Sequence, residues 1–382
     1  EEYRIILVDR ESHHTFTPLL YEIATELRDD VDVSKLRSLV VYPLSEVLEG
    51  KRVEVINDEV LHLDIQDGLV HLKNTKINFD YLVLALGSET NYFDIPGLKD
   101  NSLTLKWLRD AIAIRSALLS KKKDKKDIKV VIGGAGSTGI ELASEIKRWS
   151  SINCNFSVSI VEATPTILPG FDKRVVEKIT RRLNKLRINS ITNGIISEVK
   201  NEKVMLKNGE TIPFDVLIWT GGVKGSSLTR AMPLKQEKRG RVEILGGLEC
   251  IPETPDLKVY GHIYAIGDIA CPYDPKTGKP TALVARAAIN QADIAAKNII
   301  EEIKKERRFD HRFSTYVYKW QEYPYVIPVG GRYAVAKLGP VIISGFLGWV
   351  LKELVELRYF LSIMPFFKAV KIWLKSLWVF SK

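Results

Sequence analysis

Three glycines in a G-x-G-x-x-G spacing, Gly134, Gly136 and Gly139, carry the clearest chemical signal in this sequence. They follow the apolar stretch that begins at Ile128, so the pattern predicts a buried strand, a tight turn and a helix that opens at the third glycine. Glycine suits such a turn because it lets the backbone approach a pyrophosphate and lets the helix pack against the strand. N–H groups at the helix N-terminus then face the phosphates. The pattern therefore predicts a dinucleotide site, the alternative being a turn that is merely rich in glycine.

A second predicted strand, Phe156 to Val161, ends in Glu162. An acid at this place accepts the hydroxyls of a ribose and repels a 2′-phosphate, so the sequence favours NADH over NADPH. The predicted NADH-binding residues come from the glycine turn, the start of its helix and the ends of neighbouring strands. They are Gly134, Gly136, Ser137, Thr138, Gly139, Glu141, Glu162, Gly221, Gly222 and Val223.

The first part of the chain repeats this plan. Tyr3 to Val8 is a predicted strand that ends in Asp9, as Phe156 to Val161 ends in Glu162, and Gly87 stops a later strand as Gly221 does. Such a duplication suits two nucleotide cofactors. If Asp9 corresponds to Glu162, a strand, glycine turn and helix equivalent to residues 128–153 would precede Glu1, and we expect that segment to exist upstream with a second glycine motif.

Composition places the chain among folded proteins, with 45% hydrophobic and 27% charged residues. Part of the net charge of +9 lies in Lys121 to Lys129, which we interpret as a solvated linker. Another part lies near the C-terminus among large apolar side chains, which favours an anionic membrane surface as the partner of this charge and no nucleic acid.

The three cysteines form no C-x-x-C pair and the six histidines have no metal-ligand spacing. We therefore expect no disulfide framework, no metal and a reducing cytoplasmic compartment.

Periodicity predicts helices at Arg37 to Leu48, Asp172 to Leu186, Thr281 to Glu302 and Phe366 to Phe380. The uncharged run Leu338 to Leu351 is shorter than the ~17–25 residues that a spanning helix needs. The last helix combines lysines at positions 368, 371 and 375 with large apolar residues, so we expect it to lie in the membrane interface. The alternative is a helix buried in a dimer interface. The predicted membrane contacts are Phe346, Trp349, Phe367, Trp373 and Trp378.

Six motifs together resemble type II NADH:quinone oxidoreductases, the alternative NADH dehydrogenases of the two-dinucleotide-binding-domain flavoprotein superfamily. They are HTFTPLLYEIAT from His14, LALGSETNYFDIPG from Leu84, GGAGSTGIELASE from Gly133, VLIWTGGV from Val216, AIGD from Ala265 and VGGRYAVAKLGPVIISGFLGW from Val329.

The resemblance implies an α/β fold of two Rossmann-like domains, with the NADH domain inserted in the FAD domain. Residues 1–120 and 256–337 would form the two parts of the FAD-binding domain, 121–255 the NADH-binding domain, and 338–382 a C-terminal helical region that associates with the membrane. The implied activity passes hydride from NADH to FAD and two electrons to a quinone, without proton pumping. It also implies a peripheral, monotopic protein on the cytoplasmic face of the cell membrane and allows a homodimer.

Site residues follow from the same resemblance. Glu141 matches an acid that the family places between nicotinamide and flavin, although the helix dipole alone favours an acid in a first turn. The FAD-binding residues would be Asp9, Arg10, Pro18, Leu19, Leu20, Val60, Ala85, Leu86, Gly87, Gly267, Asp268, Ala282 and Leu283. Where the family carries A-Q-x-A-x-Q, this chain has Ala282 to Ala287 without either glutamine. The quinone candidates are therefore Leu283, Ala287, Gln291 and Lys337.

Two other functions stay open. A sulfide:quinone oxidoreductase needs paired cysteines beside the flavin, and none lies between Gly87 and Gly133. A membrane-docked nucleotide-binding protein without turnover would fit the two missing glutamines.

Overall fold

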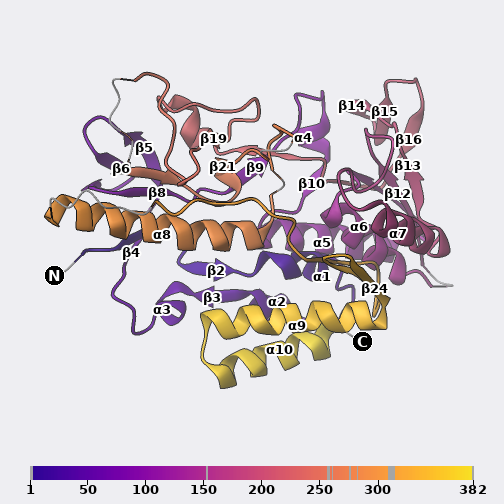
Figure 1. Ribbon diagram of the computed structural model, residues 1–382. Coiled ribbons are helices and arrows are strands. Elements are labelled where there is room, and N and C mark those ends of the chain that lie inside the picture. Colours follow the sequence, from indigo (N-terminus) through magenta and orange to yellow (C-terminus); the bar gives the residue numbers. More distant parts are fainter. Residues whose placement is uncertain are drawn as a thin grey trace. The chain divides into compact units, whose positions relative to one another are not determined.

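The computed structural model describes residues 3–151, 154–255, 259, 261–274, 277–281, 283–308 and 315–380. The chain forms two compact units. Unit 1 comprises Glu1–Ser12, Arg52–Glu89 and Val223–Tyr323, and unit 2 comprises His13–Lys51, Thr90–Gly222 and Pro324–Lys382. Parallel strands combine with helices in both, so the α/β class is confirmed (Figure 1). The predicted domain boundaries stay predictions.

A five-stranded parallel sheet lies at the centre of unit 2, in the order β10-β17-β11-β12-β13. Its strands are β10 (Leu103–Thr104), β17 (Val216–Trp219), β11 (Asp127–Gly133), β12 (Asn155–Val161) and β13 (Asn189–Ile191). Strand β11 takes the central place because Ile128 and the run from Val130 to Ile132 are buried on both faces. After β11 the chain continues to β12 on one side of it, and β17 pairs with β11 on the other side, so the order of the strands reverses direction at β11. In such sheets the carboxyl ends of the strands at the point of reversal form a ligand crevice.

Helices α5 (Leu108–Asp124), α6 (Ser137–Arg148) and α7 (Lys173–Lys185) connect this sheet. The helix predicted from Asp172 is confirmed, and the Asp172 carboxylate caps it by accepting the N–H of Arg174 at 2.9 Å. Helix α6 begins at Ser137, ahead of the third glycine, because Gly136 is its N-cap and Gly139 falls within its first turn. The antiparallel strands β14 (Ile196–Lys200), β15 (Lys203–Leu206) and β16 (Thr211–Pro213) complete this region.

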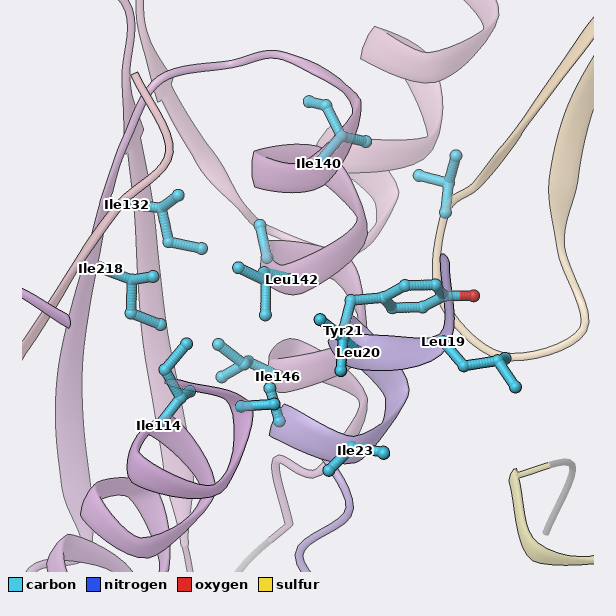
Figure 2. Close-up of a cluster of buried hydrophobic side chains, with 14 of the residues drawn as sticks. Leu19, Leu20, Tyr21, Ile23, Ile114, Ile132, Ile140, Leu142, Ile146 and Ile218 are labelled. Atoms are coloured by element: carbon cyan, nitrogen blue, oxygen red, sulfur yellow. The ribbon is translucent and has the colours of Figure 1, made fainter. Parts of the chain in front are cut away.

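The N-terminal part of unit 2 packs onto these helices. It contains β2 (His13–Thr15), a 3-10 turn (Thr17–Leu19), α1 (Leu20–Ala24), α2 (Val33–Val40), β3 (Val41–Pro43) and α3 (Leu44–Val47). Helix α1 contacts α5 and α6. Figure 2 shows Leu20 and Ile23 of α1 among the isoleucines and leucines of α5, α6 and the sheet.

Two sequence predictions are wrong in this unit. The helix predicted from Arg37 to Leu48 is interrupted by β3, because Tyr42 is buried opposite His14 of β2 and Pro43 cannot donate a helical hydrogen bond. The linker predicted from Lys121 is largely ordered, since α5 continues to Asp124 and β11 starts at Asp127. Lysines in the last turn of α5 are favoured by its dipole.

The C-terminal part of unit 2 begins with the antiparallel sheet β22 (Tyr325–Pro328), β23 (Ala334–Leu338) and β24 (Val341–Gly345). Helices α9 (Phe346–Ile363) and α10 (Phe366–Phe380) follow, and the two contact each other (Figure 1). The helix predicted from Phe366 is thus confirmed. Among the described residues no helix is both long and apolar enough to span a bilayer.

Unit 1 contains two separate parallel strand pairs, β1 (Ile6–Asp9) with β4 (Glu54–Asn57) and β8 (Leu82–Leu84) with β20 (Ile263–Ala265). It also holds the antiparallel sheet β5 (Val60–Asp64), β6 (Leu69–Leu72) and β7 (Lys76–Asn78), the pair β19 (Val242–Glu243) and β21 (Ala270–Cys271), and the long helix α8 (Ala285–Arg308). Strands β9 (Ser88–Thr90) and β18 (Val223–Gly225) follow β8 and β17 in the chain. The predicted helix from Thr281 starts later, at Ala285.

Candidate functional site

The glycine turn after β11 has the backbone shape of a phosphate site. Gly134 has φ +103°, which favours glycine, and its N–H donates to the carbonyl of Val161 at 2.8 Å. A Cβ on Gly139 would lie 2.1 Å from the carbonyl oxygen of Gly134, so the helix packs too closely there for any side chain. A Cβ on Gly136 would meet no protein atom within 4 Å. The backbone at Gly136 is therefore open to a ligand, and no side chain caps the N-terminus of α6.

Glu162 closes one side of this turn. Its Oε2 accepts the N–H of Ala135 at 2.8 Å, and its Oε1 accepts the N–H and the hydroxyl of Thr164, each at 2.9 Å. These bonds place a partly buried carboxylate at the carboxyl end of β12, beside the glycine turn. The position predicted to bind the ribose thus holds an acid whose carboxylate is fixed by three hydrogen bonds.

The end of β17 closes the other side. Strand β17 pairs with β11, and Thr220 donates its hydroxyl to the carbonyl oxygens of Gly133 and Gly134, both at 3.1 Å. Gly221 is required because a Cβ there would lie 2.3 Å from the ring of Trp219. Gly222 accepts the N–H of Asn91 at 3.0 Å. The structure therefore brings the glycine turn, Glu162 and this turn together, while Val223 belongs to unit 1.

Glu141 lies in the first half of α6, with Ser137 and Thr138 one turn before it. Burial raises the pKa of Glu141 to about 8; the Lys352 ammonium opposes this shift and the Glu22 carboxylate adds to it. At neutral pH its carboxyl group therefore carries a proton, which it can donate through a hydrogen bond or give up to a base.

A cluster of buried charges, which we call the Lys352 cluster, surrounds the ammonium of Lys352 with Glu22, Glu353 and Glu356. The Lys352 Nζ lies 2.6 Å from Glu22, 3.2 Å from Glu353 and 2.7 Å from Glu356, measured to Oε1 of each. Sequence reasoning missed these residues. Lys352 and Glu356, one turn apart in a mostly apolar helix, were the available signal, because buried charges need a partner.

Most predicted FAD-binding residues lie in unit 1. Asp9 ends β1, and its Oδ1 accepts the N–H of Glu11 at 2.8 Å. The Asp268 Oδ2 accepts the hydroxyl of Ser88 at 2.8 Å. Gly87 and Gly267 have φ +69° and φ +71°, conformations that favour glycine. The other predicted residues in this unit are the exposed Arg10 and Ala85 and the partly buried Val60 and Leu86.

A hollow in unit 1, of about 210 Å³ when the open space at its mouth is included, is lined among others by Gly267, Asp268, Thr281, Leu283, Ala287 and Gln291. It contains three of the quinone candidates and part of the predicted flavin site. Gln291 is buried and accepts the N–H of Gly267 at 2.7 Å. Ala282 lies outside the described residues.

The remaining predicted residues lie in unit 2. Leu19 and Leu20 belong to its hydrophobic core and Pro18 is exposed. Lys337 is buried in β23, with its Nζ 3.7 Å from Oδ2 of Asp172.

The predicted membrane residues lie on α9 and α10. Phe346, Phe367 and Trp378 are 57%, 86% and 52% exposed. Trp373 instead turns toward α9 and donates its indole N–H to the carbonyl of Glu353 at 3.0 Å. Trp349 is partly buried, and its ring lies against that of Phe346 at a tilt, with 5.5 Å between the ring centroids.

Comparison with known proteins gives a consistent result. Residues 1–297 match the model of the family described as pyridine nucleotide-disulphide oxidoreductase. The chain is 25% identical to the type II NADH:quinone oxidoreductase Ndh of Mycobacterium tuberculosis, over 94% of this chain and 79% of that protein. It is 26% identical to the type II NADH:quinone oxidoreductase of Staphylococcus aureus, over 94% of this chain and 88% of that protein.

Solved structures share the fold. NDH2 from Plasmodium falciparum in complex with NADH matches with a TM-score of 0.75 at 17% identity, over 100% of this chain and 94% of that chain. The sulfide:quinone oxidoreductase from Aquifex aeolicus matches with a TM-score of 0.71 at 20% identity, over 97% and 90%.

Proposed function

The chain belongs to the pyridine nucleotide-disulphide oxidoreductase family, and on this basis we propose that it is a type II NADH:quinone oxidoreductase that uses FAD. It passes hydride from NADH to the flavin and then two electrons to a quinone, without pumping protons. The observation that carries this proposal is the ordered nucleotide crevice at β11, in a chain similar over 94% of its length to enzymes of that name.

The residues of unit 2 have defined tasks in this reaction. The open backbone at Gly136 receives the pyrophosphate of NADH, and Glu162 accepts the ribose hydroxyls. Glu141 extends from the same helix and holds a proton at neutral pH. We assign Gly134, Gly136, Ser137, Thr138, Gly139, Glu141, Glu162, Gly221 and Gly222 of unit 2 to NADH on these grounds. Val223, which belongs to unit 1, stays a prediction from the sequence.

The residues of unit 1 fit FAD. Asp9 and Asp268 supply carboxylates for hydroxyl groups, and the hollow beside Gly267 and Leu283 has room next to one of them. When bound, the flavin supplies the transfer of two electrons between a hydride donor and a quinone. The four quinone candidates, Leu283, Ala287, Gln291 and Lys337, and the predicted flavin contacts from unit 2, Pro18, Leu19 and Leu20, stay proposals.

Sulfide oxidation by the same fold has less support. That chemistry needs reactive thiolates, and the three cysteines are buried and unpaired. Burial raises the pKa of the Cys154, Cys250 and Cys271 thiols, which disfavours the thiolate.

The visible spectrum of the purified protein tests the proposal. We expect a flavin spectrum that is bleached by NADH under anaerobic conditions and restored by adding a quinone. A spectrum bleached by sulfide and insensitive to NADH would support the sulfide oxidoreductase instead. A bound flavin that neither compound bleaches would indicate a binding protein without turnover.

Replacing Glu162 with glutamine should narrow the preference for NADH over NADPH. The substitution removes the charge that repels a 2′-phosphate, so we expect the ratio of kcat/KM values for the two cofactors to fall at least about tenfold, equivalent to about 1.4 kcal/mol. The steady-state rates of both cofactors measure this ratio. Glu177→Gln, an exposed carboxylate on α7, is the matched control. Equal use of both cofactors by the wild-type protein would contradict the role given to Glu162.

We propose that α9 and α10 attach the protein to one leaflet, on the cytoplasmic face of the cell membrane. Exposed apolar side chains support this proposal, among them Leu347 and Phe367, which are 65% and 86% exposed. Two lysines of α10 have partners within the protein: Lys368 pairs with Glu46, and Lys375 donates a hydrogen bond to the Ser38 hydroxyl. Of the predicted membrane contacts, Phe346, Phe367 and Trp378 are exposed and fit this role, and Trp349 lies beside Phe346. Trp373 does not, because its indole donates to the Glu353 carbonyl of α9. A homodimer is the alternative use of this surface.

The double variant Leu347→Glu, Phe367→Glu tests the membrane proposal. Burying two such side chains contributes about 3–6 kcal/mol, so their loss should lower partitioning onto anionic vesicles by about 100-fold or more. Vesicle sedimentation measures this, with Ile195→Glu, 44% exposed before β14, as the control. Unchanged sedimentation together with loss of a dimer in light scattering would favour the dimer interface.

A further inference from the structure

An exposed aromatic side chain lies beside the nucleotide crevice of unit 2. Phe93 is in the loop between β9 and α4 (Leu98–Asn101), and 47% of its side chain is exposed. Its ring meets that of Trp219, the last residue of β17, edge to face, with 6.3 Å between the ring centroids and 81° between the ring planes. A single exposed apolar side chain is ordinary in a folded protein, so exposure alone gives Phe93 no role.

The backbone at Phe93 is strained. Phe93 and Asp94 both have φ +53°, in the left-handed region that a bulky side chain rarely adopts. Such strain persists where the surrounding contacts impose it, and it is concentrated at ligand-binding and catalytic sites. Glycine or asparagine would adopt this conformation at a lower free energy. Folding alone therefore does not account for a phenylalanine at this position.

Asn91 holds the strained loop against the end of β17. Its Oδ1 accepts the N–H of Phe93 at 2.9 Å. Its carbonyl accepts the indole N–H of Trp219 at 2.8 Å, and its own N–H donates to the carbonyl of Gly222 at 3.0 Å. These hydrogen bonds fix the place of Phe93 relative to β17, so the ring loses little conformational freedom when a ligand covers it.

Gly222 makes room for the ring. A Cβ at this position would lie 3.1 Å from Cζ and 3.2 Å from Cε2 of Phe93, which is tighter than ordinary van der Waals contact. The preceding Gly221 lies against the glycine turn, since a Cβ on Gly134 would be 2.6 Å from the Cα of Gly221. The Phe93 ring therefore borders the same crevice as the glycine turn, at the carboxyl end of β17.

The two sides of the crevice suit different halves of NADH. With the pyrophosphate at the N-terminus of α6, the adenosine ribose reaches Glu162 at the end of β12. The pyrophosphate joins the two halves, so the nicotinamide riboside extends the other way, across the end of β17, which pairs with β11 on the side away from β12. Phe93 presents its exposed ring on that side.

We propose that Phe93 packs its ring against the nicotinamide riboside of bound NADH. The inference rests on the proposed function. An aromatic side chain suits this task because its large apolar surface covers the ribose or the nicotinamide and excludes water from it. Phe93 is thus a binding residue for the nicotinamide half of the dinucleotide, in addition to the residues that hold the pyrophosphate and the adenosine ribose.

Phe93→Asn tests this role with two ligands. Asparagine tolerates the left-handed backbone and lacks the ring, and Phe93→Gly is a second variant that accepts the same φ. ADP carries the adenosine and the pyrophosphate, whereas NAD⁺ carries the nicotinamide riboside as well. We expect the Kd for NAD⁺ to rise at least about tenfold, equivalent to about 1.4 kcal/mol, while the Kd for ADP changes less than about twofold. Calorimetric titration of the oxidised flavoprotein measures both values without hydride transfer.

Thermal unfolding separates this role from a structural one. A ring needed only to pack on Trp219 would lower the unfolding temperature when it is removed and leave both Kd values unchanged. The proposed role predicts an unfolding temperature of Phe93→Asn no lower than that of the wild-type protein, because the substitution relieves backbone strain. Phe93→Tyr keeps an aromatic ring and should keep the wild-type affinity for NAD⁺.

Asp94→Asn is the matched control, since Asp94 has the same φ and the substitution leaves the ring in place. It should change neither Kd. An unchanged Kd for NAD⁺ in Phe93→Asn and Phe93→Gly, or an equal rise for NAD⁺ and ADP, would overturn the inference. Wild-type protein that binds neither NAD⁺ nor ADP would instead overturn the proposed function.

Discussion

Gly136→Ala is expected to weaken NADH binding at least about tenfold without changing the free energy of unfolding. A Cβ at this position meets no protein atom within 4 Å, so the folded protein accommodates it. It would occupy the space through which a pyrophosphate approaches the N-terminus of α6. Losing one hydrogen bond to a charged phosphate costs about 1.5–3 kcal/mol, which corresponds to a roughly ten- to 100-fold rise in Kd.

Gly139→Ala is the matched comparison, because it adds the same methyl group one turn further along. Its Cβ would lie 2.1 Å from the Gly134 carbonyl oxygen and 2.9 Å from the Thr220 hydroxyl, so overpacking of about 1–3 kcal/mol should lower stability directly. Titration with NADH and thermal unfolding of both variants separate the two effects. Wild-type NADH affinity in Gly136→Ala would show that the pyrophosphate does not bind at this turn.

The nucleotide crevice was predictable because its signals are local. A continuous apolar strand, three glycines and a strand that ends in Glu162 occupy neighbouring positions, and the observed β11, α6 and β12 match them. The helix predicted from Arg37 to Leu48 is wrong because tertiary contacts favour a strand in its middle. Burial of Tyr42 and pairing of β3 with β2 overrode a helical pattern that is only a weak preference of the sequence.

The Lys352 cluster was beyond sequence reasoning. Glu22 and Lys352 are separated by 330 positions, and only the packing of α9 near α1 brings their charges together. The sequence of α9 alone does not reveal which acids enclose its lysine. The same limit applies to Trp373, which fits an outward membrane face by periodicity but donates to Glu353 in the fold.

Lys352→Met is expected to destabilise the protein by about 3–5 kcal/mol near pH 8, because it removes the counter-charge of three buried acids. The loss should be smaller near pH 5. The folded-state pKa of Glu356 is raised to about 8, so its contribution to stability is full below the unfolded value near 4.5 and declines as pH rises through the folded value. Without the ammonium this pKa rises further, so the decline continues to higher pH and its total becomes larger. Denaturant unfolding at both pH values measures the difference.

Lys368→Met on α10 is the control, since its pair with Glu46 is 42% and 49% exposed and its loss should cost less than about 1 kcal/mol at either pH. Equal destabilisation by Lys352→Met at both pH values would show that the acids around Lys352 do not take up protons when its charge is removed.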